Sequence, residues 1–279
     1  MASQRVQLEW LRRVEAEYRS AALTQHLGLW LTQIAASPDL IRDALRIADD
    51  ELAHAELSHA AYLAAGGAGA PRLDREHLAL RRRGGDPLEH DVTRVAVEMF
   101  CLGETVAVPL FSHFRARATR PAARAALDRI LRDEVRHRDF GWTLLDWLLE
   151  SDAGGDLRRL VERELPAMLR RLEDNYGDPG RAADPGEAAP GGETSSAGPR
   201  SAGPRSAGPR SAGPPAAGPR SAGPPAAGPG DPADEDAAWG LAPAADYAAI
   251  LERTVERDYR PRMARFGIDA AAAWRARRG

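Results

Sequence analysis

The chain lacks lysine altogether, so every one of its basic residues is an arginine. This absence excludes a Schiff-base lysine, and with it most pyridoxal-phosphate chemistry, and it also removes the lysine that a P-loop requires. Cysteine is almost as scarce, because Cys101 stands alone and no intramolecular disulfide can form. A net charge of −3 gives no electrostatic case for binding nucleic acid.

Two kinds of apolar segment are also missing from the sequence. Neither a charged-then-apolar signal sequence nor an uninterrupted apolar run of about 18 residues is present. We therefore expect a cytoplasmic protein that does not span a membrane. With 279 residues, 43% of them hydrophobic, the chain can bury a sizeable core and has the composition of a soluble globular protein.

Helical periodicity dominates residues 1–176, and no alternating strand pattern competes with it. We predict five amphipathic helices, at residues 6–36, 38–65, 86–118, 120–150 and 155–176. Residues 70–86 are long enough to cross a bundle from end to end. Pro109 falls inside the third helix, where it should loosen a turn just beyond Glu104. The predicted fold class is all-α, a four-helix bundle with a long crossover and an added fifth helix.

The composition changes abruptly after Tyr176. Seven pentapeptides of the form Ser/Ala-Ala-Gly-Pro-x run from Ser196 to Gly230, and such a tract cannot bury apolar surface. We therefore predict a disordered Ala/Gly/Pro-rich linker over residues 177–236, which acts as a spacer rather than binding an anionic partner through its arginines. The C-terminal helical segment, residues 237–279, should contain one more amphipathic helix that runs up to Pro261 and packs back on the bundle, because a lone helix has no core of its own.

Two short stretches carry the chemistry: Asp50-Glu51-Leu52-Ala53-His54 and Asp133-Glu134-Val135-Arg136-His137. In each stretch a glutamate and a histidine stand three residues apart, so both side chains project from one helix face toward the interior. A single Glu-x-x-His is a weak signal, because a solvated glutamate and a satisfied histidine explain most of its occurrences. Two copies in one chain, each with a core-facing glutamate upstream, are a strong signal.

Those upstream glutamates are Glu17 and Glu104, which lie on the apolar stripes of their helices. Their neighbours Glu15 and Glu98 fall roughly 200° and 120° away around the helix. Two such hairpins facing each other would bring four carboxylates and two imidazoles to one level of a bundle, a ligand set suited to two iron or manganese ions. The predicted metal ligands are Glu17, Glu51, His54, Glu104, Glu134 and His137. The alternative is a metal-free bundle in which these groups form buried ion pairs at considerable desolvation cost.

Several other residues have the chemistry for a role near such a centre, yet packing explains them better. They are Cys101, His59, His113, Trp142, Trp147 and Tyr62. We assign none of them as catalytic, and the catalytic residues remain unknown from the sequence.

The chain resembles the ferritin-like superfamily of di-iron carboxylate proteins over about residues 5 to 150. Within it, the likeness is strongest to a bacterial family of ferritin-like domain proteins of unsettled activity. The matching stretches are Glu17-Tyr18-Arg19-Ser20-Ala21-Ala22, Asp50-Glu51-x-x-His54-Ala55, Gly103-Glu104-Thr105, Asp133-Glu134-x-x-His137, Trp239-Gly240-Leu241 and Arg260-Pro261-Arg262. The resemblance implies the same six metal ligands. It also implies that Asp50 and Asp133 hydrogen-bond the ligating histidines.

Three classes of function share this ligand set. The first is an oxygen-activating oxidase or oxygenase acting on an unknown small molecule, and the second is iron oxidation or peroxide scavenging. The third is a structural or partner-binding bundle that metal merely stabilises. A long tail argues against a storage cage, and a single cysteine cannot supply the Cys-x-x-Cys iron site of rubrerythrin-like proteins. We therefore favour an oxidoreductase, although Val108 stands where several bacterial monooxygenases place a threonine.

The expected cofactor is two iron ions, with manganese or a mixed manganese/iron pair left open. Expected reactants are dioxygen or peroxide and an unidentified small molecule. An electron-donor protein and a homodimer are left open as partners. We expect no nucleic acid and no membrane.

Overall fold

The computed structural model describes residues 1–177 and 232–278, and these residues form helices without any strand. The all-α prediction is therefore confirmed for this part of the chain. The first hairpin consists of α1 (Gln4–Gln33) and α2 (Pro38–Ala64). The hydroxyl of Ser3 accepts a hydrogen bond from the backbone N–H of Val6 and so caps the start of α1. Gly66, at a φ of 94° that favours glycine, turns the chain away after α2.

The second hairpin pairs a long interrupted helix with a regular one. Its members are α3 (Leu88–Val95), η2 (Ala96–Glu104), α4 (Thr105–Arg117) and α5 (Pro121–Glu150). η2 is a π-helical stretch, and it ends on Glu104. The structure therefore places the loosened turns before Glu104 rather than beyond it, and Pro109 lies within the regular α4. A short 3-10 helix, η1 (Arg75–His77), interrupts the crossover between the hairpins.

A glycine of α5 allows α5 and η2 to approach each other closely. A Cβ atom added to Gly141 of α5 would lie 2.5 Å from Cβ of Phe100 and 2.9 Å from the backbone nitrogen of Cys101. No residue larger than glycine fits this position without displacing η2. Gly141 therefore sets the spacing between the π-helical stretch and α5.

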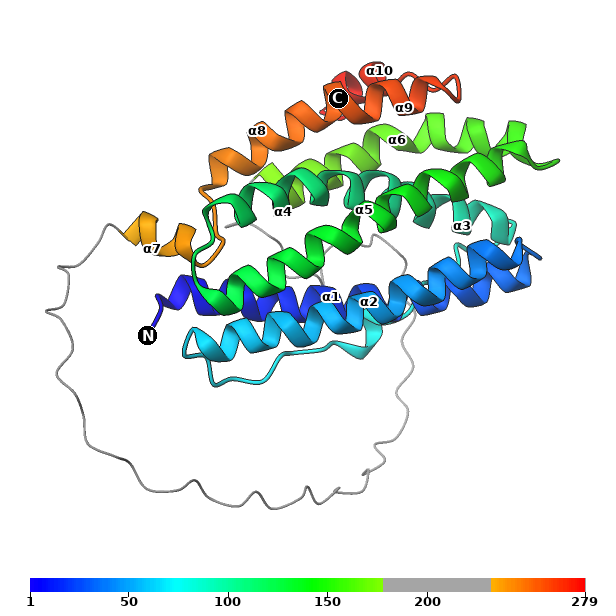
Figure 1. Cartoon of the computed structure of the whole chain (residues 1–279). Coiled ribbons are helices and arrows are strands. Elements are labelled where there is room, and N and C mark those ends of the chain that lie inside the picture. The colour runs from blue at the N-terminus through cyan, green and yellow to red at the C-terminus, as the bar shows by residue number, and fades with distance from the viewer. Residues whose placement is uncertain (178–231, 279) are drawn as a thin grey trace, which may run out of the picture.

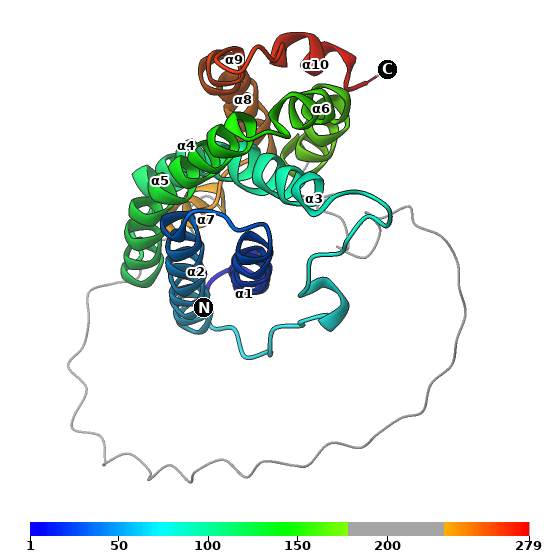
Figure 2. The same ribbon diagram turned by 90° about the vertical axis from the view of Figure 1, so that its right-hand side faces the viewer.

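The remaining helices are α6 (Gly154–Gly177), α7 (Pro232–Ala238), α8 (Ala244–Thr254), η3 (Val255–Tyr259), α9 (Arg260–Ala264) and α10 (Ala270–Ala276). All of them except α7 form an outer layer. The layers are clearest end-on, with α1 and α2 on one side, α3 to α5 in the middle, and α6 with α8 to α10 on the other side (Figure 2). Figure 1 shows the same arrangement along the helices, with α8 lying beside α4 and α6.

Residues 232–242, which include α7, pack on the first hairpin and on the loop that precedes α5. The indole of Trp10 donates a hydrogen bond to the carbonyl of Trp239 at 3.2 Å. Arg5 forms an ion pair with Asp236 at 2.8 Å, and the backbone N–H of Thr119 donates to the carbonyl of Ala238. The contacts of Trp10 and Arg5 each join residues more than 200 positions apart in the sequence.

Two boundaries differ from the sequence expectation. α7 begins at Pro232, inside the predicted linker of residues 177–236, while residues 178–231 lie outside the described part of the chain. The last long helix was expected to end at Pro261, but helical structure continues through it to Ala264. The proline ring crowds the carbonyl of Arg257, and that carbonyl belongs to the wider π-helical turn of η3, where the helix accommodates the proline.

One helical stretch, Leu88–Arg117, is long and apolar enough to cross a membrane by length and composition alone, with a mean hydropathy of 1.5. Half of its apolar window is buried inside the protein, and it carries Glu104. A core helix of a soluble protein passes the same test, so this is weak evidence for a membrane span. The cytoplasmic location stays a prediction.

Candidate metal centre

The structure brings the six predicted ligands together between the two hairpins. Each long helical stretch contributes to the cluster, because each places a glutamate or a Glu-x-x-His pair on its inward face. Five of the six side chains are buried, and Glu104 at the end of η2 is partly exposed. The two imidazoles lie side by side, with 5.7 Å between ring centroids.

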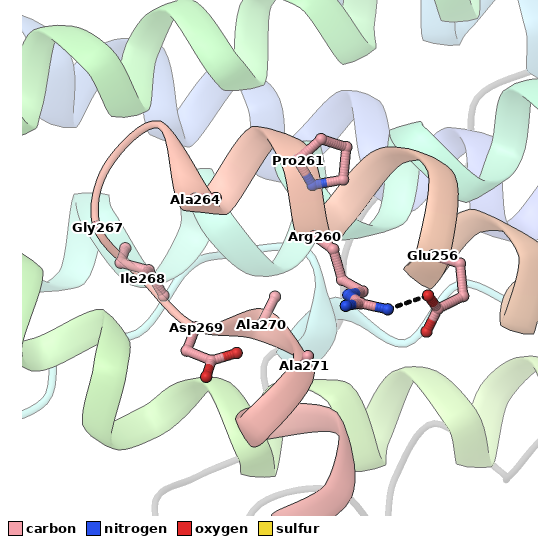
Figure 3. Close-up of a pocket in the computed structure, with 9 residues that line it drawn as sticks. All are labelled: Glu256, Arg260, Pro261, Ala264, Gly267, Ile268, Asp269, Ala270 and Ala271. Atoms are coloured by element: carbon pink, nitrogen blue, oxygen red, sulfur yellow. Dashed lines mark hydrogen bonds and ion pairs between the residues drawn. The ribbon is translucent and has the colours of Figure 1, made fainter.

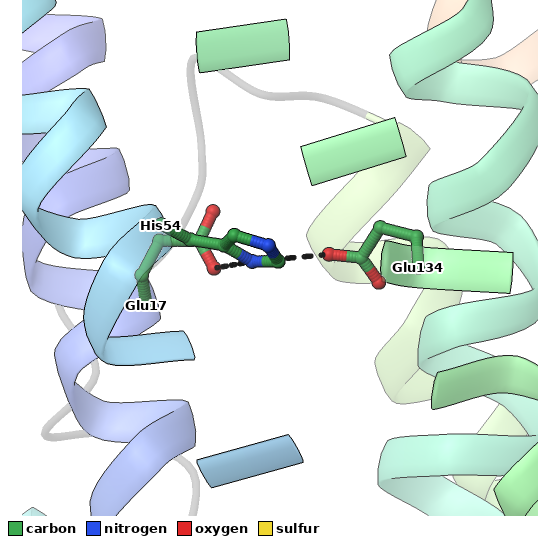
Figure 4. Close-up of side chains that lie close together, drawn as sticks. All are labelled: Glu17, His54 and Glu134. Atoms are coloured by element: carbon green, nitrogen blue, oxygen red, sulfur yellow. Dashed lines mark ion pairs between the residues drawn. The ribbon is translucent and has the colours of Figure 1, made fainter. Parts of the chain in front are cut away.

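The potential ligand atoms fall into two groups of three. Glu17, His54 and Glu134 form one group and are drawn in Figure 4. The other group consists of Glu51, Glu104 and His137. Within each group every pair of ligand atoms lies within 4.8 Å, which is the spacing needed to coordinate one ion.

Two glutamates connect these groups. Glu51 places Oε2 at 3.6 Å from Nδ1 of His54 and Oε1 at 3.5 Å from Nδ1 of His137. Glu134 does the same from the opposite side, with Oε1 at 3.8 Å from Nδ1 of His54 and Oε2 at 3.6 Å from Nδ1 of His137. Each of the two carboxylates thus presents one oxygen to each half of the centre, so Glu51 and Glu134 could bridge two ions.

The cluster contains buried polar atoms that no protein group satisfies. Four of them are Oε2 of Glu51, Nδ1 of His54, Oε2 of Glu134 and Nδ1 of His137. An unpaired buried donor or acceptor costs roughly 1–3 kcal/mol. Oε2 of Glu51 lies 3.6 Å from Nδ1 of His54, and Oε2 of Glu134 lies 3.6 Å from Nδ1 of His137, so one cation between the atoms of each pair would satisfy all four. The residues present therefore fit a pair of metal ions.

The other nitrogen of each histidine is held by an aspartate of the opposite motif. Nε2 of His54 lies 3.2 Å from Oδ2 of Asp133, and Nε2 of His137 lies 3.4 Å from Oδ2 of Asp50. This arrangement leaves Nδ1 of each ring free to face the cluster and selects the tautomer that can ligate a metal. These hydrogen bonds connect α2 and α5 through both motifs.

A cap of arginines covers these aspartates, and we did not predict it from the sequence. Arg136 donates to Asp50 at 2.5 Å and to Asp133 at 3.3 Å, while Arg129 contacts both aspartates as well. Arg132 also reaches Asp133, at 3.4 Å. The spacing of Arg129 and Arg136 from Asp133, four and three residues along one helix, is the sequence signal that could have indicated it.

A further unpredicted contact lies inside the cluster. The hydroxyl of Ser20 donates a hydrogen bond to Oε1 of Glu51 at 3.0 Å. Ser20 follows Glu17 on α1 by three residues, so one helix face supplies both groups.

Burial and neighbouring charges raise the pKa of several groups in the cluster. Burial, together with the charge of Glu51, raises the pKa of Glu17 to about 8. Burial and the charge of Glu134 also raise the pKa of Glu104 well above its usual range. Burial disfavours a charged His54, but its contacts with Glu17 and Glu51 outweigh this effect and raise its pKa to about 10. Without a cation, the cluster is held together by protons that a metal would replace.

The remaining sequence candidates lie at packing positions. Burial raises the pKa of Cys101 well above its usual value, so this residue is a buried thiol rather than a thiolate. His113 pairs with Asp246 at 3.0 Å, and His59 stacks on Tyr62. Trp147 is partly buried against the core. Trp142 differs from the others, because its indole donates to the hydroxyl of Thr105, next to Glu104.

A surface pocket of about 620 Å³ lies away from the cluster, in the C-terminal segment (Figure 3). Its lining includes Glu256, Arg260 and Asp269 but none of the six predicted ligands. Glu256 and Arg260 pair with each other, and Asp269 caps α10 by accepting from the backbone of Ala272. The polar groups of this pocket are thus already satisfied within the protein.

Comparisons with family models, with curated proteins and with solved structures give no match to this chain. No family is therefore established, and the resemblance to ferritin-like proteins stays a hypothesis. The geometry of the cluster alone supports a metal centre.

Proposed function

We propose that the chain is a ferritin-like four-helix bundle that binds two metal ions, iron in the first instance, and uses them to activate dioxygen for the oxidation of a small molecule. The single observation that carries the proposal is the pair of carboxylates, Glu51 and Glu134, that each face both imidazoles while two of their buried oxygens lack any partner. Hard carboxylate oxygens with imidazoles are the donor set that iron and manganese favour.

The residues of the chain have separable roles in this proposal. Glu17 and Glu104 would each hold one ion, and Glu51 and Glu134 would hold the two ions together. Asp50 and Asp133 orient the histidines, and the arginine cap neutralises these aspartates and separates them from bulk water. A bound iron pair would supply electrons for the reduction of dioxygen.

The cluster is buried except at Glu104, and this partial exposure favours a reactive role for the metal ions over a purely structural one. A structural metal site is closed, whereas a catalytic site keeps an open side. Five of the six ligands are buried, but Glu104 is partly exposed. A small reactant would therefore approach the centre from the η2 side.

Metal analysis and oxygen reactivity together test the proposal. The protein is stripped with a chelator, loaded anaerobically with ferrous iron and desalted, and we expect close to two ions per chain. Exposure to air should then oxidise the bound iron with uptake of dioxygen, measured with an oxygen electrode. Two bound ions that are inert to both dioxygen and peroxide would support the metal-stabilised structural alternative. Failure to bind iron or manganese would reject the centre.

Matched variants assign the ligands. Glu134→Gln and His54→Ala should lower the stoichiometry, because each removes a ligand atom. Glu56→Gln and His59→Ala are the controls, since both residues lie on α2, the helix of His54, but away from the cluster, and Glu56 is exposed. Unchanged stoichiometry in the ligand variants would contradict the assignment.

A further inference from the structure

The C-terminal segment contacts the backbone around Glu104 at a point where nothing in the proposed function requires it. The side chain of Tyr259, the last residue of η3, is fully buried. Its hydroxyl donates a hydrogen bond of 2.6 Å to the carbonyl of Leu102, two residues before Glu104. Burial raises the pKa of Tyr259 well above its usual range, so the hydroxyl keeps its proton and remains a donor.

A second contact lies on the other side of Glu104. The indole of Trp142 donates a hydrogen bond of 2.9 Å to the hydroxyl of Thr105, which is itself buried. The same indole contacts the C-terminal segment, because the Phe266 ring stacks on it at an interplanar angle of 5°. The guanidinium of Arg262 also lies over the indole, 5.4 Å from the ring centroid. The C-terminal segment thus reaches Thr105 through Trp142.

These contacts matter because they lie at the end of the π-helical stretch η2. Glu104 is the last residue of the π-helical stretch, and each extra residue that a helix absorbs rotates the following side chains by about 100°. If η2 relaxed to a regular α-helix, the direction of Glu104 relative to the other ligands would change. A π-helical stretch is less stable than an α-helix and persists only where its surroundings support it.

We infer that Tyr259, with Trp142, is a positioning residue that holds the end of the π-helical stretch and so directs Glu104 toward Glu51 and His137. This inference rests on the proposed metal-binding function. It assigns a role to the segment after residue 231: completion of one half of the metal centre from outside the two hairpins. In the part of the chain that the structure describes, this segment also bonds α1, through Arg13 and the carbonyl of Gly240, but none of its hydrogen bonds falls within two residues of Glu17, His54 or Glu134.

The test compares Tyr259→Phe with Tyr247→Phe in the full-length protein. The first substitution removes only the hydroxyl that binds Leu102. Tyr247 is the matched control, a buried tyrosine of the same segment whose ring packs on Phe114 instead. Binding of Mn²⁺ alone is titrated and followed by electron paramagnetic resonance. We expect Tyr259→Phe to lower the affinity for one of the two ions by about tenfold and to leave the affinity for the other unchanged.

Selective loss of one ion distinguishes positioning from general destabilisation. A variant that is merely less stable would bind both ions more weakly. A loss of affinity of similar size in Tyr247→Phe would likewise indicate general destabilisation. Equal weakening of both ions, or no change at either, would overturn the inference. If Tyr259→Phe fails to fold, Trp142→Phe, which removes the N–H that binds Thr105, should show the same selective loss, and its absence would overturn the inference.

A metal-free measurement separates this inference from the proposed function. Hydrogen exchange of the amides of residues 96–106 in the chelator-treated protein should be faster in Tyr259→Phe than in wild type and unchanged in Tyr247→Phe. If the wild-type protein binds no metal, the proposed function fails, and the exchange result still decides whether Tyr259 holds η2. Equal exchange rates in wild type and Tyr259→Phe would overturn the holding role even if two ions bind.

Discussion

The two hairpins carry the same ligand pattern but differ in how they are built. α1 and α2 are regular α-helices, and they bury all three of their ligands. The second hairpin reaches its first ligand through a π-helical stretch, leaves Glu104 partly exposed, and supplies all three arginines of the cap from α5. The first hairpin thus buries its part of the cluster, whereas the second leaves Glu104 partly exposed and has the backbone just before Glu104 bonded by Tyr259 of the outer layer.

The largest expected effect comes from a residue that belongs to both halves. Glu134→Ala removes a carboxylate that faces His54 and His137 equally, so it should weaken both ions, by at least about 100-fold, beyond the 10- to 100-fold typical of residues that only orient a ligand. Helicity should be preserved, because alanine favours the helix. Metal content after desalting and far-UV circular dichroism measure the two effects.

His54→Ala and His137→Ala test whether Glu134 serves both halves, because each histidine belongs to only one half. Each should chiefly weaken the ion on its own side. If Glu134→Ala lost no more metal than either histidine variant, Glu134 would not bridge the halves.

A pair of glycines compares the packing of the two hairpins directly. A Cβ on Gly141 would lie 2.5 Å from Phe100, whereas a Cβ on Gly28 of α1 would lie 3.8 Å from its nearest neighbour, Leu45. Gly141→Ala should destabilise the protein by about 1–3 kcal/mol through overpacking. Gly28→Ala should be neutral or stabilise by up to about 1 kcal/mol, because alanine is the better helix former. Denaturant unfolding of the two variants measures this difference, and equal free energies would contradict the close approach of η2 and α5.

Sequence reasoning identified the residues of the cluster because each is set by local periodicity. A stripe at helical spacing distinguishes Glu17 from Glu15, and a repeated Glu-x-x-His marks the rest. It placed the irregular turns of the third helix on the wrong side of Glu104, because Pro109 is a local signal while the close packing of Gly141 on η2 is not. The contact of Tyr259 with Leu102 spans 157 positions and has no local signature. Such long-range polar contacts could not be predicted from periodicity.

The pH dependence of the metal-free protein follows from the raised pKa values in the first hairpin. The folded protein binds more protons than the unfolded chain, because the pKa of Glu17 is about 8 and that of His54 is about 10, both above their unfolded values. This stabilisation is complete at low pH and is lost as pH rises toward 8 and then 10. The Tm of the metal-free protein, measured by calorimetry, should therefore fall between pH 6 and pH 9.

Metal should reverse this trend, since a cation replaces the protons and binds more tightly as pH rises. The metal-loaded protein should keep or raise its Tm over the same range. A metal-free Tm that increased from pH 6 to pH 9 would mean that the cluster does not hold excess protons.

The smallest expected effect concerns the arginine cap, the asymmetric feature that α5 alone provides. Arg136 contacts both aspartates but is half exposed, with 47% of its side chain accessible, so solvent screens the interaction. Arg136→Gln should therefore weaken metal binding by only about two- to fivefold. Arg132, which is 65% exposed and reaches Asp133 alone at 3.4 Å, is the control and should show less change as Arg132→Gln. If both substitutions had the same effect, the cap would act through its total charge rather than through the orientation of Asp50, and the two histidines would be held equally well without it.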